Sequence, residues 1–371
     1  MKKLALSLVV PLLGASGPAS AESVRVYVGT YTSGPGQGIY RLKLDLATGA
    51  LTPDGPPTEA DSPSFLAWSP DGTRLFAVEE TGEVRTATSG FVRSFAVDAA
   101  TGALTPLGRQ PSGGAGPCHV SASRDGRHVF VANYAGGSVS AFPVAADGRL
   151  GPASAFVQHP AADGAVPHAH SVDLDPAGAR LVVADLGLDT VFAYPFDAAK
   201  GKLGAPGKAS LSKGAGPRHV AFHPGGRHLY VIDELNATVT VLGYADGAFT
   251  ELQTVPTLPA DFKAKNSTAE IAVSPDGRFV YGSNRGHDSI AIFAVDPAKK
   301  TLTPAGHQPS GGKHPRHFAI DPTGAFLLAA NRDSDNVVVF RIDRETGGLT
   351  PVGEPVRIPK AVCLLMRRGE K

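Results

Sequence analysis

Residues 216–234 read GPRHVAFHPGGRHLYVIDE, and the fold follows from this stretch. Apolar residues alternate with others on both sides of a Pro-Gly-Gly turn, as at Val220 and Val231. This pattern predicts a β-hairpin made of two short strands. Because an antiparallel hairpin returns the chain to its starting level, Arg218 and Glu234 should finish side by side at one rim.

The same hairpin turn recurs along the chain. Its variants SPDG, SRDG, DPAG, HPGG and DPTG end at glycines about 50 residues apart, namely Gly72, Gly126, Gly178, Gly226, Gly277 and Gly324. Another strand pair follows each hairpin, as in SVSAF at 138–142 and NVVVF at 336–340. Four strands in each repeat predict an all-β fold, a β-propeller with four-stranded blades.

The two ends of the chain supply a seventh blade. Residues 24–31 (VRVYVGTY) and 38–53 (GIYRLKLDLATGALTP) are typical of three strands of a blade that lacks its first, and residues 359–366 (PKAVCLLM) of a lone first strand. Joining them closes the ring and removes an exposed sheet edge. A single seven-bladed domain over residues 22–371 is therefore predicted. A β-sandwich would not explain the regular spacing, and the turn-rich pattern excludes a helical solenoid.

Residues 1–21, MKKLALSLVVPLLGASGPASA, combine two lysines, an apolar run and a small-residue end. This order predicts a Sec-type signal peptide cleaved near Ala21, and so a periplasmic or secreted protein without a membrane anchor after cleavage. The formal net charge of +1, with no basic or acidic run, argues against nucleic acid or an anionic membrane as a partner. The sequence does not indicate an oligomeric state.

The cysteines and the sequence motifs exclude several kinds of functional site. The two cysteines, Cys118 and Cys363, fall on non-neighbouring blades, so two free thiols are expected rather than a disulfide. No His or Cys spacing is typical of a metal site, and no GxSxG elbow, dinucleotide fingerprint or P-loop is present. We therefore expect no metal ion and no other cofactor.

Equivalent positions of the repeat define two rings at one mouth of the propeller. The first ring, eight residues before each turn glycine, contains Ser64, Cys118, His170, Arg218, Ala269 and Arg316, with Lys360 as its seventh member. The second ring, eight residues after each turn glycine, contains Glu80, Tyr134, Leu186, Glu234, Arg285 and Arg332, with Tyr31 as its seventh member. Cations outnumber acids in these rings, which favours an anionic ligand or a reaction oxyanion. The alternative is an ion-pair network that only satisfies a water-filled channel.

Three further histidines directly follow first-ring positions. Strict alternation along a strand would turn His119, His219 and His317 away from the channel, into a structural position between blades.

Several blocks of the sequence resemble the seven-bladed lactonase family, which includes bacterial 6-phosphogluconolactonases and fungal carboxymuconate lactonizing enzymes. These blocks are VYVGTYT at 26–32, SPDGRFVYGSNRGHDSIAIF at 274–293, and the stretches at 216–242 and 314–340 with their PRH hairpins. The resemblance covers roughly Val24 to Met366. It implies lactone chemistry at the channel mouth, with catalytic roles for His170, Glu234, Arg218 and Arg285.

Lactone hydrolysis needs an activated water, a stabilised oxyanion and a proton for the leaving alkoxide. Either His170 or Glu234 is a candidate general base, and Arg218 beside Glu234 would lower the pKa of that carboxyl, which favours His170. The expected substrate-binding residues are Arg316, Arg332, Glu80, Tyr134, Tyr31 and Lys360. The leading hypothesis is a lactonase acting on a sugar or carboxylated anionic lactone. The alternatives are a muconate-type lactonizing cyclase and a non-catalytic propeller that binds an anionic sugar or a protein.

Overall fold

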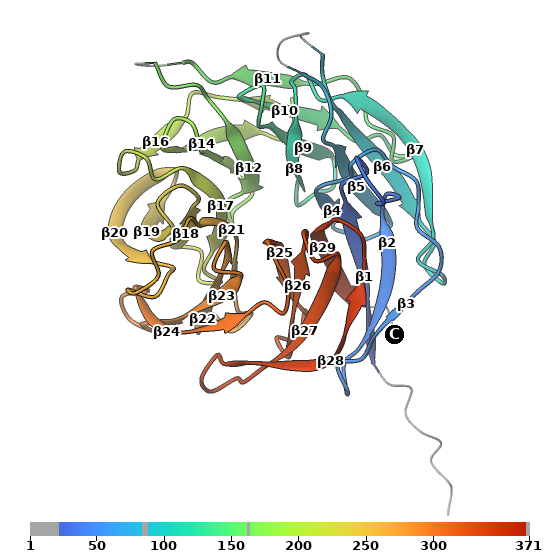
Figure 1. The fold of residues 1–371 in the computed structure, drawn as a ribbon. Helices are drawn as coiled ribbons and strands as arrows, with labels where there is room; N and C mark the ends of the chain where they lie inside the picture. Colours follow the sequence, from blue (N-terminus) through green and yellow to red (C-terminus); the bar gives the residue numbers. More distant parts are fainter. Residues whose placement is uncertain (1–21, 84–87, 162–163, 369–371) are drawn as a thin grey trace, which may run out of the picture.

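The computed structural model describes residues 22–83, 88–161 and 164–368. These residues form an all-β propeller with seven sheets around a central axis and no helix in the described ranges (Figure 1). The predicted seven-bladed architecture is thus confirmed. The predicted signal peptide lies outside the described residues, and within them no helix is long and apolar enough to cross a membrane.

Each blade is an antiparallel sheet whose first strand lies nearest the axis and whose later strands follow outward. The first four blades are β29 (Ala361–Arg368), β1 (Ser23–Thr30), β2 (Tyr40–Asp45) and β3 (Leu51–Pro53); β4 (Leu66–Trp68), β5 (Arg74–Glu79), β6 (Phe91–Val97) and β7 (Leu104–Pro111); β8 (Pro117–Ala122), β9 (His128–Asn133), β10 (Ser138–Pro143) and β11 (Ala155–Gln158); β12 (Ala169–Leu174), β13 (Arg180–Asp185), β14 (Thr190–Asp197) and β16 (Gly207–Ser210), with β15 (Lys202–Leu203) also on β14.

The remaining three blades repeat the same order. They are β17 (Pro217–Phe222), β18 (His228–Asp233), β19 (Thr238–Ala245) and β20 (Ala248–Pro256); β21 (Ser267–Val273), β22 (Phe279–Arg285), β23 (Ser289–Val295) and β24 (Leu302–Pro309); β25 (Pro315–Ile320), β26 (Phe326–Asn331), β27 (Asn336–Ile342) and β28 (Leu349–Arg357).

The hairpin between β17 and β18 has the predicted register. Val220 pairs with Val231, and the turn closes through a 2.8 Å hydrogen bond from the Gly226 N–H to the His223 carbonyl. Gly226 adopts a φ of 74°, in the left-handed region where a side chain would be strained. Such a turn therefore returns the chain tightly and holds the two strands in register.

Ring closure joins the two ends of the chain. Strand β29 pairs antiparallel with β1, from Val24 opposite Arg368 to Thr30 opposite Ala361. Each of the seven buried apolar clusters lies between two neighbouring blades, and one of them contains Val26 and Leu364 together with Phe326 of the last blade. The blades therefore stabilise one another around a complete ring, and the apolar contact closes where the termini meet.

A β-bulge interrupts the start of most first strands. The register shifts between Pro217 and His219, and equivalent shifts occur in β8, β12, β21 and β25. A bulge places two residues of one strand opposite a single partner residue, which re-aims a side chain. Two consecutive side chains can therefore face the axis at this level.

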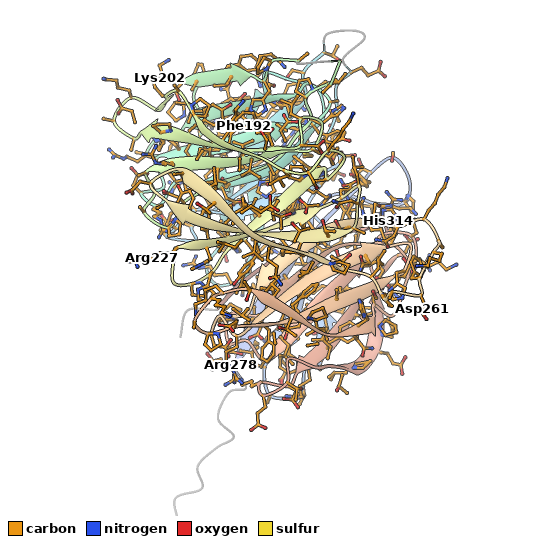
Figure 2. The ribbon with its side chains drawn as sticks, turned by 90° about the vertical axis from the view of Figure 1, so that its left-hand side faces the viewer. Phe192, Lys202, Arg227, Asp261, Arg278 and His314 are labelled. Atoms are coloured by element: carbon orange, nitrogen blue, oxygen red, sulfur yellow. The ribbon has the colours of Figure 1, made fainter. Side chains whose placement is uncertain are left out.

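The two faces of the propeller are distinct. In the side view of Figure 2, Arg227 and Arg278, which follow turn glycines, lie at one face, and His314, which precedes β25, lies at the other. The second face carries the first- and second-ring positions.

Cys118 and Cys363 are both buried free thiols, as predicted, and burial raises the pKa of each.

Candidate active site

The predicted pairing of Arg218 with Glu234 is confirmed. Arg218 lies at the bulge of β17 and Glu234 directly follows β18, and Arg218 Nε is 2.9 Å from Glu234 Oε2. Arg285, at the end of β22, places its Nη2 2.8 Å from the same carboxylate oxygen. Two blades therefore bring two guanidinium groups onto one oxygen atom.

Backbone carbonyls of β21 complete this arrangement. Arg218 Nη1 donates to the Ala269 carbonyl at 2.7 Å, and Arg285 Nη2 donates to the neighbouring Thr268 carbonyl. The side chains are buried, with exposed fractions of 2% for Arg218 and 6% for Arg285 against 19% for Glu234. Burying these charged groups costs hydration energy, and the attraction of the two guanidinium groups to the Glu234 carboxylate must offset that cost.

The charges at the mouth determine the protonation state of Glu234. Burial raises the pKa of Glu234, but the guanidinium groups of Arg218 and Arg285 outweigh burial and hold this pKa below its usual range. The carboxylate is therefore ionised at neutral pH. Both contacts are made by Oε2, and for Oε1 no hydrogen bond to another described residue is found.

His170 lies at the bulge of β12 and is 4% exposed. Its ring is 5.4 Å from the ring of Tyr134 in an edge-on contact, and its Nδ1 has no hydrogen-bond partner among the described residues. Burial and the nearby positive charge, Arg218 first, lower the pKa of His170 well below its usual value. His170 is thus a neutral imidazole at neutral pH.

Arg316 is the third arginine of the mouth. Its guanidinium carbon lies 5.5 Å from the centre of the Tyr31 ring, and Tyr31 Oη is 3.1 Å from a Glu80 carboxylate oxygen. Burial raises the pKa of Tyr31 to about 12, so the phenol keeps its proton for Glu80. In the described part of the chain, no carboxylate lies within ion-pair distance of Arg316, although, against the effect of burial, the charges of Glu80 and Glu234 raise its pKa. Its charge is therefore available to a ligand.

The other predicted binding residues make local contacts. Tyr134 stacks on His168 with ring centres 4.6 Å apart. Arg332 pairs with Asp333 at 2.8 Å, and Lys360 Nζ is 3.6 Å from Asp335, so carboxylates of the segment between β26 and β27 engage both cations. The structure does not join these two cations to the cluster around Glu234.

The expected orientation of His119, His219 and His317 is wrong. The three rings pack around Phe65, with centres 4.0, 5.6 and 5.5 Å from the Phe65 ring, so they face the axis instead of the space between blades. The β-bulges explain the difference, because they turn the residue after each first-ring position inward as well. Sequence reasoning also missed Glu270, whose Oε2 is 3.0 Å from His219 Nδ1 and 3.1 Å from His317 Nε2. The recurring Pro-X-His triplet was the available signal.

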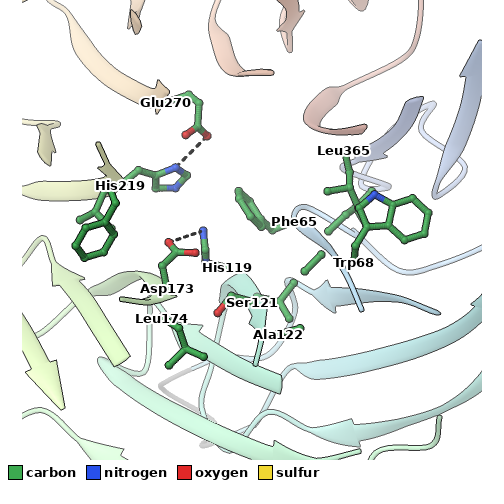
Figure 3. A pocket seen from close by; sticks show the side chains of 15 residues that line it. Phe65, Trp68, His119, Ser121, Ala122, Asp173, Leu174, His219, Glu270 and Leu365 are labelled. Atoms are coloured by element: carbon green, nitrogen blue, oxygen red, sulfur yellow. Dashed lines mark hydrogen bonds and ion pairs between the residues drawn. The ribbon is translucent and has the colours of Figure 1, made fainter. Parts of the chain in front are cut away.

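A cavity of about 470 Å³ lies beyond this layer, on the side away from the arginines. Figure 3 shows Phe65 between the His119 and Trp68 side chains, with Asp173 beside His119 and Glu270 beside His219. Partial removal from water, with the charge of Glu270, raises the pKa of Asp173, although 38% of its side chain stays exposed. The walls are otherwise largely apolar.

Two candidate sites therefore share the propeller axis. The ionisable side chains of the cavity are acids and neutral histidines, which do not attract an anion. The mouth carries Arg218, Arg285 and Arg316 and suits an anionic ligand. In the described ranges, no group of three or more His, Cys, Asp and Glu side chains is placed to hold a metal ion.

The chain belongs to the seven-bladed β-propeller lactonase family, since the family model described as lactonase, 7-bladed beta-propeller, matches residues 25–366. The 6-phosphogluconolactonase of Bacillus subtilis (strain 168) is 38% identical to it over 298 residues, covering 79% of this chain and 83% of the relative. The 6-phosphogluconolactonase of Formosa agariphila is 34% identical over 313 residues, covering 79% and 85%. The solved structure of the periplasmic gluconolactonase of Pseudomonas aeruginosa matches with a TM-score of 0.87 and 34% identity, covering 94% of this chain and all of that one. The resemblance seen in the sequence is confirmed.

The charges around His170 predict its titration. NMR of protein labelled only in histidine, with the resonance assigned by His170→Gln, should find this ring neutral at pH 6 and above. Replacing Arg316 by Gln removes a positive charge that disfavours the imidazolium, so the pKa of His170 should rise toward its ordinary value of about 6.5. Arg227→Gln, on the opposite face, is the control and should change nothing. Titration of His170 near pH 6.5 in the unmodified protein would contradict this account.

Proposed function

We propose that this protein hydrolyses an anionic sugar or carboxylated lactone at the arginine-lined mouth of the propeller. The observation that carries the proposal is one carboxylate, Glu234, shared by two buried arginines, and His170 lies in the same first ring of positions at this mouth as Arg218. The names of the relatives support the same chemistry, since two are 6-phosphogluconolactonases and one solved structure is a periplasmic gluconolactonase.

In the proposed mechanism, His170 removes a proton from a water molecule that attacks the lactone carbonyl. Arg218 and Arg285 donate to the oxyanion that develops on the carbonyl oxygen. The ring C–O bond then breaks, and the imidazolium of His170 returns its proton to the leaving alkoxide. The product is a hydroxy acid, whose carboxyl group ionises and releases one proton to the solution.

Glu234 has a supporting role in this proposal. A carboxyl group whose pKa is held below its usual range is a weaker base than an ordinary glutamate and holds no proton to donate at neutral pH. It keeps two like charges together and orients both guanidinium groups toward the substrate. The pKa of His170 is lowered too, so the choice of His170 as the general base rests on its contacts: both arginines engage Glu234, whereas Nδ1 of His170 has no partner among the described residues.

The remaining charge of Arg316 points to the substrate class. A guanidinium binds carboxylate or phosphate oxygens through paired hydrogen bonds, and this one has no carboxylate partner among the described residues. We infer that Arg316 binds the anionic substituent of the lactone, with Tyr31 and Glu80 fixing its position. Tyr134 forms a neighbouring wall beside His170.

We also propose that the protein is exported by a signal peptide, residues 1–21, with cleavage near Ala21. The apolar run and small-residue end support it, as does the periplasmic location named for the Pseudomonas aeruginosa relative. Residues 22–371 then form one propeller domain.

The function is tested by proton release from a panel of δ- and γ-lactones, including 6-phosphogluconolactone, with spontaneous hydrolysis subtracted. Turnover should appear in the wild type. It should fall by about 10²-fold or more in kcat for Arg218→Gln, the usual effect of removing an oxyanion donor. Arg227→Gln makes the same substitution on the opposite face and should retain full activity.

The alternatives give different results in this assay. A lactonizing cyclase would consume a muconate, with loss of ultraviolet absorbance, and would release no acid from any lactone. A binding propeller would retain a sugar acid without turnover. If Arg218→Gln is folded and as active per molecule as the wild type, the mouth is not the site.

The role of Arg316 predicts a change in specificity. Arg316→Gln should raise the KM for 6-phosphogluconolactone about 10-fold or more, the effect expected for loss of a charged hydrogen bond. The KM for uncharged glucono-δ-lactone should change much less, because that substrate carries no anionic substituent. Comparing two substrates on one variant cancels any effect on folding or on His170. Equal changes for both lactones would remove Arg316 from substrate recognition.

A further inference from the structure

A hydrogen-bonded chain continues from Arg218 into the protein, away from the mouth. Arg218 Nη1 is 3.1 Å from His219 Nε2, and His219 Nδ1 is 3.0 Å from Glu270 Oε2. His317 Nε2 approaches the same oxygen at 3.1 Å from the other side. The chain links β17, β21 and β25, three consecutive blades.

The chemistry of arginine fixes the direction of these hydrogen bonds. A guanidinium has donors and no acceptor, so His219 Nε2 must accept from Arg218 and cannot itself carry a proton. The single proton of the neutral His219 ring then lies on Nδ1, where it donates to Glu270. Glu270 is therefore the acceptor that stabilises this tautomer from the other ring nitrogen.

The same reasoning applies from the opposite side. The backbone N–H of Leu364 donates to His317 Nδ1 at 3.3 Å, so the proton of His317 lies on Nε2 and donates to Glu270. The backbone N–H of Ile271 donates to Glu270 Oε1 at 3.0 Å. Burial raises the pKa of Glu270, and His317 with Arg218 opposes that effect. Three N–H donors thus converge on one buried carboxylate.

We propose that Glu270 is a positioning residue for Arg218, acting through His219, which it holds in the Nδ1–H tautomer. This inference rests on the proposed lactonase function. With Nε2 unprotonated, His219 offers a lone pair to Arg218 Nη1 and helps to fix the guanidinium plane beside Glu234. The other tautomer would direct an N–H at an N–H and push the guanidinium away from its place.

Two variants separate the acceptor oxygen from the charge. Glu270→Met removes every acceptor at nearly the same length, and Glu270→Gln keeps one oxygen. We expect kcat to fall by about 10-fold to 10²-fold in Glu270→Met, the range found for groups that orient a catalytic residue, and by less in Glu270→Gln. Because Arg218 is assigned to the transition state, KM should stay nearly constant.

The matched control is Asp173→Asn, which changes a carboxyl group in the cavity below without contact to Arg218. It should leave kcat and KM unchanged. In an Arg218→Gln background, Glu270→Met should cause no further loss of kcat, because Glu270 acts only through Arg218. A purely structural role of Glu270 would instead lower the melting temperature and leave kcat per folded molecule intact, which would overturn the inference.

The tautomer is read directly by ¹⁵N NMR of histidine-labelled protein, with His219 assigned by His219→Gln. The wild type should show a protonated Nδ1 and an unprotonated Nε2, and Glu270→Met should shift the ring toward a mixture of the two tautomers. An Nε2–H tautomer in the wild type overturns the inference, even if Glu270→Met fails to fold. If no lactone is turned over, the proposed function fails, but the NMR result still shows whether the hydrogen-bonded chain from Arg218 to Glu270 exists. If the wild type is active and Glu270→Met is equally active, only the positioning role of Glu270 is overturned.

Discussion

The site depends on one interaction, the contact of Glu234 Oε2 with two buried arginines. Each partner needs the others, because an unpaired charge at this depth would cost several kcal/mol. The hairpin of β17 and β18 supplies Arg218 and Glu234, and the next blade supplies Arg285 together with the Thr268 and Ala269 carbonyls. The contact of Glu234 with Arg218 and Arg285 therefore forms only where these two blades pack correctly. Ring closure, which holds all blades together, is in this sense a requirement of the site.

The β-bulges give the axis two chemically different layers. The upper layer carries guanidinium groups and an ionised glutamate, and the lower layer carries neutral histidines around Phe65 and Glu270. An anion is attracted to the first layer and gains nothing from the second. The same lower layer supports the upper one, since His219 accepts a hydrogen bond from Arg218. The bulges at the start of most first strands thus separate the arginine layer from the histidine layer that supports it.

Much of this arrangement follows from the sequence, and the misses have physical causes. Regular turn spacing predicts seven blades, and hairpin geometry brings Arg218 to Glu234, because both depend on local periodicity. A bulge breaks the strict alternation on which the predicted orientation rests, so the inward turn of His219 and the role of Glu270 were not predicted. Arg332 belongs to the second ring by spacing, yet Asp333 beside it in the sequence holds its side chain, a choice of rotamer that spacing does not contain.

The central claim is that the mouth, rather than the cavity around Phe65, binds the reacting molecule. The most direct test is a crystal structure of the protein with 6-phosphogluconate, the acid that 6-phosphogluconolactone yields. The account predicts the anion within hydrogen-bond distance of Arg285 and Arg316, with the carbon chain beside His170. Electron density for this acid in the cavity among Phe65, Trp68 and Asp173, with the mouth empty, would contradict the account.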